Sequence, residues 1–202
     1  MKAAELISAL LSKDELWETP VILSRNQLLI TPNDVEKHAY FVTEGCLRAF
    51  YVSEHEEHTI RFGYKNSVIT SIPSYYTGEP SLFYLQAIRK TTVRPISKKN
   101  LEAFVRAESE RMEAYILLMQ SIVEQQIERE IDLLTSSPIE RLNRVRKRSP
   151  QVFQEVPLKY IASYLRMTPE TLSRILKSWF QSRTEQSEKL SFESWNTQNW
   201  FS

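Results

Sequence analysis

Three side chains in the last quarter of the chain combine the hydrogen-bonding groups that recognise nucleic-acid bases. Glu170, Ser173 and Arg174 lie in the segment PETLSRILKSWF (169–180), whose apolar residues recur at helical spacing. On a helix these three share one exposed face, because residues three and four apart are neighbours. An arginine can pair with guanine O6 and N7, a glutamate can accept from cytosine N4, and a serine can contact either. The alternative is a surface Glu–Arg pair worth about 0.3–0.5 kcal/mol; we favour contacts with base edges.

Neighbouring residues carry side chains that suit phosphate oxygens. Lys177 lies about one helical turn beyond Arg174. Ammonium and hydroxyl groups of this kind hold the sugar–phosphate backbone and set the register of a protein on a duplex. The expected phosphate contacts are Lys159, Thr168, Thr171 and Lys177.

Two short helices must position these side chains. PLKYIASYL (157–165) and PETLSRILKSWF are joined by a three-residue turn, with Thr168 as the expected N-cap and Pro169 at the first helical position. The apolar contacts between the helices are expected from Ile161, Leu165, Leu172 and Ile175. This pattern is typical of a helix-turn-helix, whose second helix enters the DNA major groove. A plain structural helix pair would show the same spacing, so the pattern alone does not decide between them.

The charge distribution favours the DNA-binding interpretation. The whole chain carries 26 Lys+Arg and 25 Asp+Glu, a formal charge of +1. Residues 139–180 hold nine basic and three acidic side chains, a local charge of +6, while residues 1–138 carry −4. A charge run is usually a solvated face, but here it coincides with the helix-turn-helix. A basic domain beside an acidic one therefore predicts phosphate binding.

A long uninterrupted helix is predicted between about Ser109 and Thr135, where the sequence contains no Gly or Pro. It should be about 39 Å long at 1.5 Å per residue. Its apolar stripe includes Met112, Ile116, Met119, Val123 and Ile127. We interpret the stripe as the seam of a parallel homodimer; the alternative is a helix packed on its own β-domain. Ser137 then caps a further helix, PIERLNRVRKR (138–148), with Pro138 at its first position.

The sequence pattern of the first half of the chain is typical of an antiparallel β-domain. Short segments rich in β-branched and aromatic residues are separated by polar clusters, after a short helix at 2–12. Glu44-Gly45 and SEHEEH (53–58) are expected to be hairpin turns, and Ser97 to cap the helix that follows. The expected strand segments are 27–30, 39–45, 46–53, 58–64, 82–88 and 91–97.

This arrangement resembles the cyclic-AMP receptor/fumarate–nitrate regulator (Crp/Fnr) family of bacterial transcription regulators over about residues 1–180. The specific part is I-A-x-Y-L-x-M-T-x-E-T-L-S-R, within PLKYIASYLRMTPETLSRILK. The resemblance implies an α+β fold with an N-terminal β-roll of the cyclic-nucleotide-binding type, a dimerisation helix and a C-terminal helix-turn-helix domain. The implied boundaries are 1–108, 109–136 and 137–202. It also implies that Glu170, Ser173 and Arg174 read base edges, in half-sites that are TTGA-like in the fumarate–nitrate branch.

The family's cyclic-nucleotide pocket is expected to be degenerate. The family's Gly-Glu pair falls at Thr70-Ser71, and its Arg-Ser pair falls at about Ser81-Leu82. A buried phosphate without a cation is costly, so tight cyclic-AMP binding is not expected. The alternative is a cyclic-nucleotide-responsive regulator with an altered pocket. Candidate effector-pocket residues are Phe62, Tyr64, Ser71, Tyr75 and Ser81.

No cofactor or metal is expected. The single cysteine, Cys46, cannot hold the iron–sulfur cluster of the oxygen-sensing branch. His55 and His58 lie in the SEHEEH segment, where a solvated hairpin tip is the favoured interpretation. The chain has 3 glycines and neither a phosphate-cradling loop nor a nucleophile–base motif, so an enzyme is not expected.

The expected function is that of a homodimeric, sequence-specific transcription regulator in the cytoplasm, with an effector other than cyclic AMP or none. Its expected partners are palindromic double-stranded DNA, a second copy of the chain and RNA polymerase, with no membrane. No signal peptide or membrane span is expected from the hydropathy pattern. An effector would rotate the helical domains about the 135–138 junction. The role of the tail that contains Trp195 and Trp200 is left open.

Overall fold

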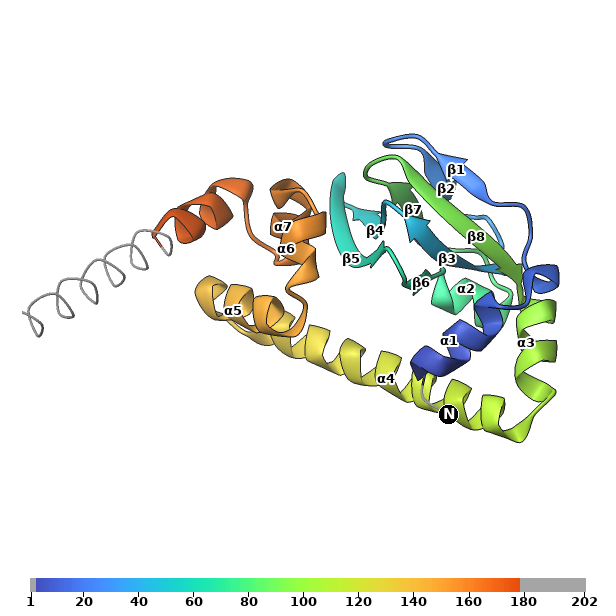
Figure 1. The fold of residues 1–202 in the computed structure, drawn as a ribbon. Helices are drawn as coiled ribbons and strands as arrows, with labels where there is room; N and C mark the ends of the chain where they lie inside the picture. Colours follow the sequence, from blue (N-terminus) through green and yellow to red (C-terminus); the bar gives the residue numbers. More distant parts are fainter. Residues whose placement is uncertain (1–2, 179–202) are drawn as a thin grey trace, which may run out of the picture.

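A β-domain, one long helix and a small helical domain follow one another along the chain (Figure 1). The computed structural model describes residues 3–178. The strands are β1 Val21–Leu23, β2 Leu28–Ile30, β3 His38–Glu44, β4 Cys46–Ser53, β5 Glu56–Tyr64, β6 Val68–Ile69, β7 Tyr84–Ala87 and β8 Thr91–Ser97. The helices are α1 Ala3–Leu11, α2 Ile72–Thr77, α3 Lys98–Arg106, α4 Ser109–Leu134, α5 Pro138–Arg148, α6 Gln151–Glu155 and α7 Leu158–Tyr164, with a 3₁₀ turn at Asp14–Leu16. Residues 169–178 are also helical.

Two four-stranded antiparallel sheets form the β-domain. Their strand orders are β1-β8-β3-β6 and β2-β7-β4-β5. Between them lies a core in which five side chains have no exposed surface: Val42, Leu47, Leu85, Ala87 and Val93. The predicted fold class, an antiparallel β-domain followed by helices, is confirmed. Three short elements of the β-domain were not predicted: the two-residue strand β6, the three-residue strand β1 and the six-residue helix α2. Segments this short do not show a hydrophobic periodicity in the sequence.

Gly45 joins the two sheets and does not turn a hairpin, so that prediction is wrong. Strand β3 pairs with β8 and β6, whereas β4 pairs with β5 and β7. The chain crosses between sheets at Gly45, which has φ +90°. A Cβ at this position would lie 2.4 Å from the Lys90 carbonyl oxygen and 2.5 Å from Thr91 Oγ1. Glycine is therefore required by both the backbone conformation and the available space.

The second predicted turn, between β4 and β5, is confirmed as a hairpin. Its central residues Glu54 and His55 have φ of 51° and 68°, as a two-residue turn between twisted strands requires. His55 is exposed and His58 is half-buried against Tyr51, with ring centroids 5.1 Å apart. Within residues 3–178, no three His, Cys, Asp or Glu side chains are grouped so that they could hold a metal ion.

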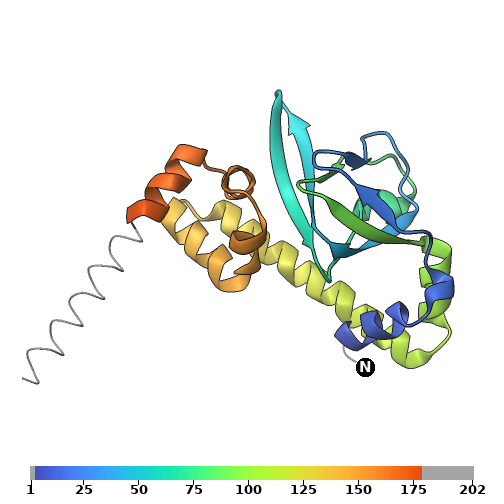
Figure 2. The ribbon, with the colours of Figure 1, turned by 45° about the horizontal axis from the view of Figure 1, so that its top comes forward.

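Helix α4 runs from beneath the β-domain to the helical domain (Figure 2). Its first turns pack against α1 and α3, where Leu6, Leu10, Phe104, Val105 and Ala114 form a buried cluster. Ser97 caps α3 as predicted, with its hydroxyl oxygen accepting from Asn100 N–H at 3.3 Å. Within residues 3–178, no helix combines the length and the apolar character needed to cross a bilayer.

The helical domain shares a core with one end of the β-domain. Leu142, Val145, Ile161, Leu165 and Leu172 are buried together from three helical segments. Cys46 and Ile88 of the β-domain belong to the same buried cluster. Ser137 caps α5 as predicted, accepting from Glu140 N–H at 3.3 Å. The two domains therefore meet through side chains and not through α4 alone.

Candidate nucleic-acid interface

The turn between α7 and the helix at 169–178 has a defined hydrogen-bonding pattern. Leu165 N–H donates to the Ile161 carbonyl at 2.8 Å, and Met167 N–H donates to the Ala162 carbonyl at 3.0 Å. Arg166 adopts φ 51°, the left-handed conformation that ends many helices. Thr168 Oγ1 then accepts from Thr171 N–H at 3.2 Å and starts the second helix. The Thr168 cap therefore lies where the sequence predicted it.

The two helices are held at a fixed angle by buried apolar side chains. Ile161, Leu165 and Leu172 have no exposed surface, and Ile175 and Leu176 pack against them partly buried. These are the inward-facing positions expected from the helical spacing. A rigid core beneath the second helix fixes the direction of its outer face, as recognition of a groove requires.

The outer face of the second helix lies at the surface of the described part of the chain. Glu170, Arg174 and Lys177 are exposed and Ser173 is half-buried; with Ser178 they line a shallow groove of about 510 Å³. Among residues 3–178, no ion pair joins Glu170 to Arg174. Hydrogen bonds from its own backbone N–H and then from the Thr168 hydroxyl lower the pKa of Glu170. These contacts favour the charged form of the carboxylate.

The expected phosphate contacts lie on α7, at the cap of the second helix and along that helix. Lys159 is exposed and its Nζ lies 4.5 Å from the centre of the Tyr160 ring. Thr168 is exposed and Thr171 half-buried, and their hydroxyls lie 3.1 Å apart. Lys177 stands one turn further along the helix.

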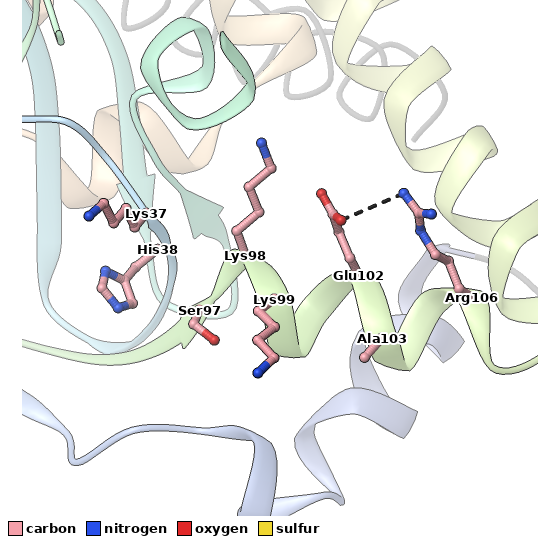
Figure 3. A pocket seen from close by; sticks show the side chains of 8 residues that line it. All are labelled: Lys37, His38, Ser97, Lys98, Lys99, Glu102, Ala103 and Arg106. Carbon is pink, nitrogen blue, oxygen red and sulfur yellow. Dashed lines mark ion pairs between the residues drawn. The ribbon is translucent and has the colours of Figure 1, made fainter. Parts of the chain in front are cut away.

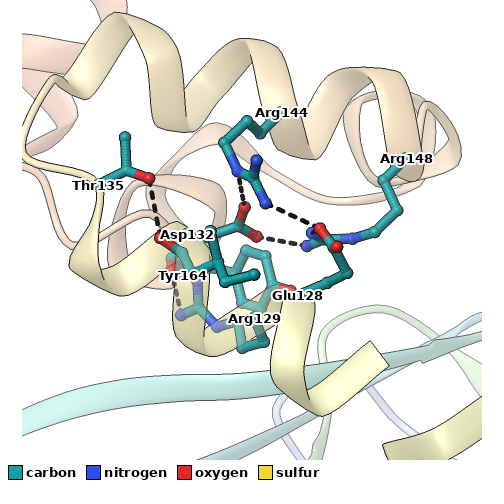
Figure 4. A network of polar contacts seen from close by, with 8 residues as sticks. Glu128, Arg129, Asp132, Thr135, Arg144, Arg148 and Tyr164 are labelled. Carbon is teal, nitrogen blue, oxygen red and sulfur yellow. Dashed lines mark hydrogen bonds and ion pairs between the residues drawn. The ribbon is translucent and has the colours of Figure 1, made fainter. Parts of the chain in front are cut away.

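The positive charge counted from the sequence is not all available to DNA. On α5, Arg144 Nε donates to Asp132 Oδ1 at 2.9 Å, and Arg148 Nη2 donates to Asp132 Oδ2 at 2.5 Å (Figure 4). Arg144 Nη2 also reaches Glu128 Oε2 at 2.8 Å. Asp132 has no exposed surface. Two of the four arginines of α5 are thus tied to α4, and the charge of +6 overstates what this domain offers to phosphate.

A docking contact between α7 and β5 was missed by sequence reasoning. The Ser163 hydroxyl accepts from Thr59 N–H at 3.1 Å and from Thr59 Oγ1 at 3.0 Å, and donates to the Glu57 carbonyl at 3.0 Å. The rings of Phe62 and Tyr164 lie 5.4 Å apart. No local pattern could have revealed contacts between residues more than 100 positions apart.

Arg48 reinforces this contact from inside the β-domain. Its guanidinium lies between two rings, 3.9 Å from the centre of Phe50 and 4.3 Å from the centre of Tyr160 in α7. It is 2% exposed and pairs with Glu57. The Arg89–Glu155 ion pair adds a second link at the edge of the interface. The helix-turn-helix is therefore held in one orientation relative to the β-domain.

The apolar stripe of α4 is uncovered. The exposed fractions of Ile116, Val123 and Ile127 are 49%, 58% and 52%. Met112, Ile116, Met119 and Val123 line a groove of about 620 Å³. Met112 also packs against the α1–α3 cluster, so the first residue of the expected seam belongs partly to the chain's own core.

The five expected effector-pocket residues are not brought together. Ser71 Oγ and Ser81 Oγ hydrogen-bond each other at 2.8 Å and are 1% and 2% exposed. Tyr75 is buried in the adjoining α2. Phe62 and Tyr64 instead line a separate cleft at the junction of the two domains. The interpretation of these five residues as one pocket is therefore corrected, because Phe62 and Tyr64 face the helical domain.

A second basic surface surrounds the start of α3 (Figure 3). It is a shallow groove of about 640 Å³, and several of its polar side chains already have partners. Lys98 Nζ donates to the carbonyls of Tyr75 and Tyr76 at 2.9 and 3.2 Å, and Glu102 pairs with Arg106 at 3.6 Å. His38 Nε2 lies 3.0 Å from Glu18. This groove takes no part in the helix-turn-helix face.

Solved structures share this fold, although no protein-family model and no curated protein sequence matches the chain. FixK2 from Bradyrhizobium japonicum is 16% identical, with 81% of this chain and 85% of that chain covered and a TM-score of 0.69. A CooA variant from Carboxydothermus hydrogenoformans is 16% identical, with 90% and 85% covered and a TM-score of 0.66. CLP from Xanthomonas campestris, described as a c-di-GMP-responsive global regulator linked to virulence gene expression, is 12% identical, with 89% and 92% covered and a TM-score of 0.61. At these identities the likeness shows a common fold.

Proposed function

We propose that the chain is a sequence-specific DNA-binding transcription regulator of the Crp/Fnr type that acts as a homodimer. The observation that carries the proposal is the exposed face of Glu170, Ser173, Arg174 and Lys177 on a helix anchored by a capped turn and a buried core. The shared fold with CLP, which is described as a regulator of gene expression, supports the same conclusion. Glu170, Ser173 and Arg174 would read base edges, in palindromic sites with TTGA-like halves.

The uncovered stripe of α4 supports the homodimer. Apolar side chains about half exposed along one face of a 26-residue helix need a partner of the same length and character. A second copy of α4 has the same length and the same apolar face. The two helices would run parallel and contact each other through Ile116, Val123 and Ile127. The two recognition helices would then be set about one DNA turn, roughly 34 Å, apart.

We also propose that the β-domain does not use cyclic AMP. The Ser71 and Ser81 hydroxyls bond to each other, and Ser81 Oγ further bonds to the backbone of Phe83. A cyclic phosphate placed there would have to break this pair without an arginine to compensate. The proposed units are 1–108 for sensing, 109–136 for dimerisation and 137–202 for DNA, acting in the cytoplasm with RNA polymerase as a further partner. Residues 179–202 of the last unit, which include Trp195 and Trp200, lie outside the described residues.

Selection from random DNA duplexes tests the proposal. The purified chain should enrich a palindrome, and Arg174→Ala should lose the enriched sequence while keeping the dimer mass. Arg25→Ala is the matched control, because Arg25 is an exposed arginine of the β-domain. Recovery of no palindrome by the wild type, or equal binding by Arg174→Ala, would refute it. Saturable calorimetric binding of cyclic AMP or cyclic GMP would instead favour a cyclic-nucleotide-responsive regulator.

A further inference from the structure

A cleft of about 410 Å³ lies where the β-domain, α4 and the helical domain meet. That volume falls within the usual range of small-molecule sites, about 300–1,000 Å³. Its walls come from β5, the loop after it and the start of β6, from one face of α4, and from the end of α5 with α6 and α7. The lining residues are Ile60, Arg61, Phe62, Tyr64, Ser67, Val68, Gln125, Gln126, Arg129, Arg148, Ser149, Val152 and Tyr164.

The lining contributed by residues 3–178 holds three guanidinium groups and no carboxylate. Arg129 is 7% exposed, stacks 3.7 Å from the centre of the Tyr164 ring and donates to the Tyr164 carbonyl. Its Nη1 is buried without a hydrogen-bond partner, and so is Nη1 of Arg148, whose Nη2 is held by Asp132. Arg61 is half-buried, and its side chain has no hydrogen bond or ion pair within the described part of the chain.

This concentration of positive charge is costly without a counterion. Burial lowers the pKa of Arg61 and of Arg129, as expected for cations moved out of water. Arginine nevertheless keeps its proton at neutral pH, so the charge must be balanced by something else. Among residues 3–178, the carboxylates paired with Arg148 are those of Asp132 and Glu128, and both are already shared with Arg144.

We propose that the cleft binds a compact phosphorylated anion, held by Arg61 together with Arg129 and Arg148. Guanidinium groups match phosphoryl oxygens in bidentate geometry, which gives them both strength and selectivity for that group. Phe62, Tyr64 and Tyr164 supply apolar walls, and Gln125 and Gln126 supply amide groups at the exposed rim. A phosphoryl group would thus meet three cations that this structure leaves incompletely paired.

The ligand would join the two domains. Arg61 belongs to β5, whereas Arg148 and Tyr164 belong to the helical domain. An anion bound between them favours the docked arrangement, in which Ser163 bonds to Thr59, because binding stabilises the state that binds. The effect on DNA affinity rests on the proposed function; binding of the anion does not.

Calorimetry without DNA tests the site, with inorganic pyrophosphate as the probe. The wild type should bind it saturably at one site per chain, and Arg61→Gln should weaken binding at least tenfold. Arg61→Lys should also weaken it, because it keeps the charge and loses the bidentate fork. Arg25→Gln removes an exposed arginine elsewhere and should bind like the wild type.

Two further titrations show whether pyrophosphate binds in this cleft and whether the cleft is selective for phosphoryl groups. Arg174→Ala should bind pyrophosphate with the affinity of the wild type, because it changes only the helix proposed to face DNA. Pyrophosphate binding is therefore expected even if the proposed DNA-binding function is wrong. Malonate should bind much more weakly than pyrophosphate, and equal affinity would refute selectivity for phosphoryl groups. Absence of saturable binding by the wild type, equal loss in Arg25→Gln, or loss in Arg174→Ala alone would overturn the proposal. Circular dichroism of each variant confirms that it is folded.

Discussion

At the junction of α4 and α5, Asp132 should be the polar residue whose substitution lowers the free energy of unfolding most. Its carboxylate has no exposed surface and accepts from Arg144 at 2.9 Å and from Arg148 at 2.5 Å. Asp132→Asn keeps the shape and one acceptor oxygen but removes the charge that both arginines face. Hydrogen bonds that involve a charged group contribute about 1.5–3 kcal/mol each, and one bond from a charged arginine to the amide oxygen survives at about 1.5 kcal/mol.

The expected loss for Asp132→Asn is therefore about 3 kcal/mol of unfolding free energy, since both arginines are partly solvated. For a chain of this size, about 2–4 °C is lost per kcal/mol, so Tm should fall by roughly 6–12 °C at this rate. Thermal and urea unfolding measure this loss at one fixed protein concentration, because the proposed dimerisation would make stability depend on concentration.

Glu128→Gln is the matched control for Asp132→Asn. Glu128 pairs with the same two arginines, but its side chain is 47% exposed. Exposed pairs contribute about 0–1 kcal/mol, so its Tm should change little. The expected role of Asp132 is refuted if the unfolding free energy of Asp132→Asn lies within about 0.5 kcal/mol of the wild type, or if both variants lose the same amount. Burial of Asp132 would then add nothing to the strength of its ion pairs. The ion-pair network would then not stabilise the packing of α5 against α4.

Three other perturbations have defined outcomes. Gly45→Ala should cost several kcal/mol in urea unfolding, because φ is +90° and the new Cβ would meet the Lys90 carbonyl oxygen at 2.4 Å; Gly78→Ala, at φ +77° with open space around it, should cost less. Ile127→Glu should shift the chain from dimer to monomer in light scattering, because it puts an unpaired charge in the proposed seam, while Leu117→Glu, exposed but off the stripe, should not. Burial raises the pKa of the Cys46 thiol to about 12, so a thiol reagent at about pH 8 should react with it only after denaturation; rapid reaction of the folded chain would contradict its buried place in the shared core.

Much of the fold could be predicted because its signals are local. The bounds of β4 and β8 follow from runs of β-branched and aromatic residues, and the helix starts at Ser97, Ser137 and Thr168 follow from side chains that cap their own helix within three positions. The helix-turn-helix face was readable for the same reason. Residues three and four apart on a helix must share a face, whatever the rest of the chain does.

The predicted elements also specify which side chains lie on the outer face of the last described helix. The sequence alone determined a β-domain, a 26-residue helix and a basic helical domain whose outer helix carries Glu170, Ser173 and Arg174. It could not tell which basic side chains are free, because their counterions lie on another helix. Arg144 and Arg148 contribute to the basic charge counted from the sequence and are bonded to Asp132 in the structure.

Only the tertiary structure decided how the domains meet. Thr59 and Ser163 are 104 residues apart, and one hydroxyl links β5 to α7. The same docking places Phe62 and Tyr64 away from Ser71 and Ser81 and brings Arg61 into one cleft with Arg129 and Arg148. Hydrogen bonds and charges act over a few ångströms of space, and hydrophobic periodicity reports only a residue's own element. The sequence therefore determines each element's face, while the chain's path in space decides which faces touch.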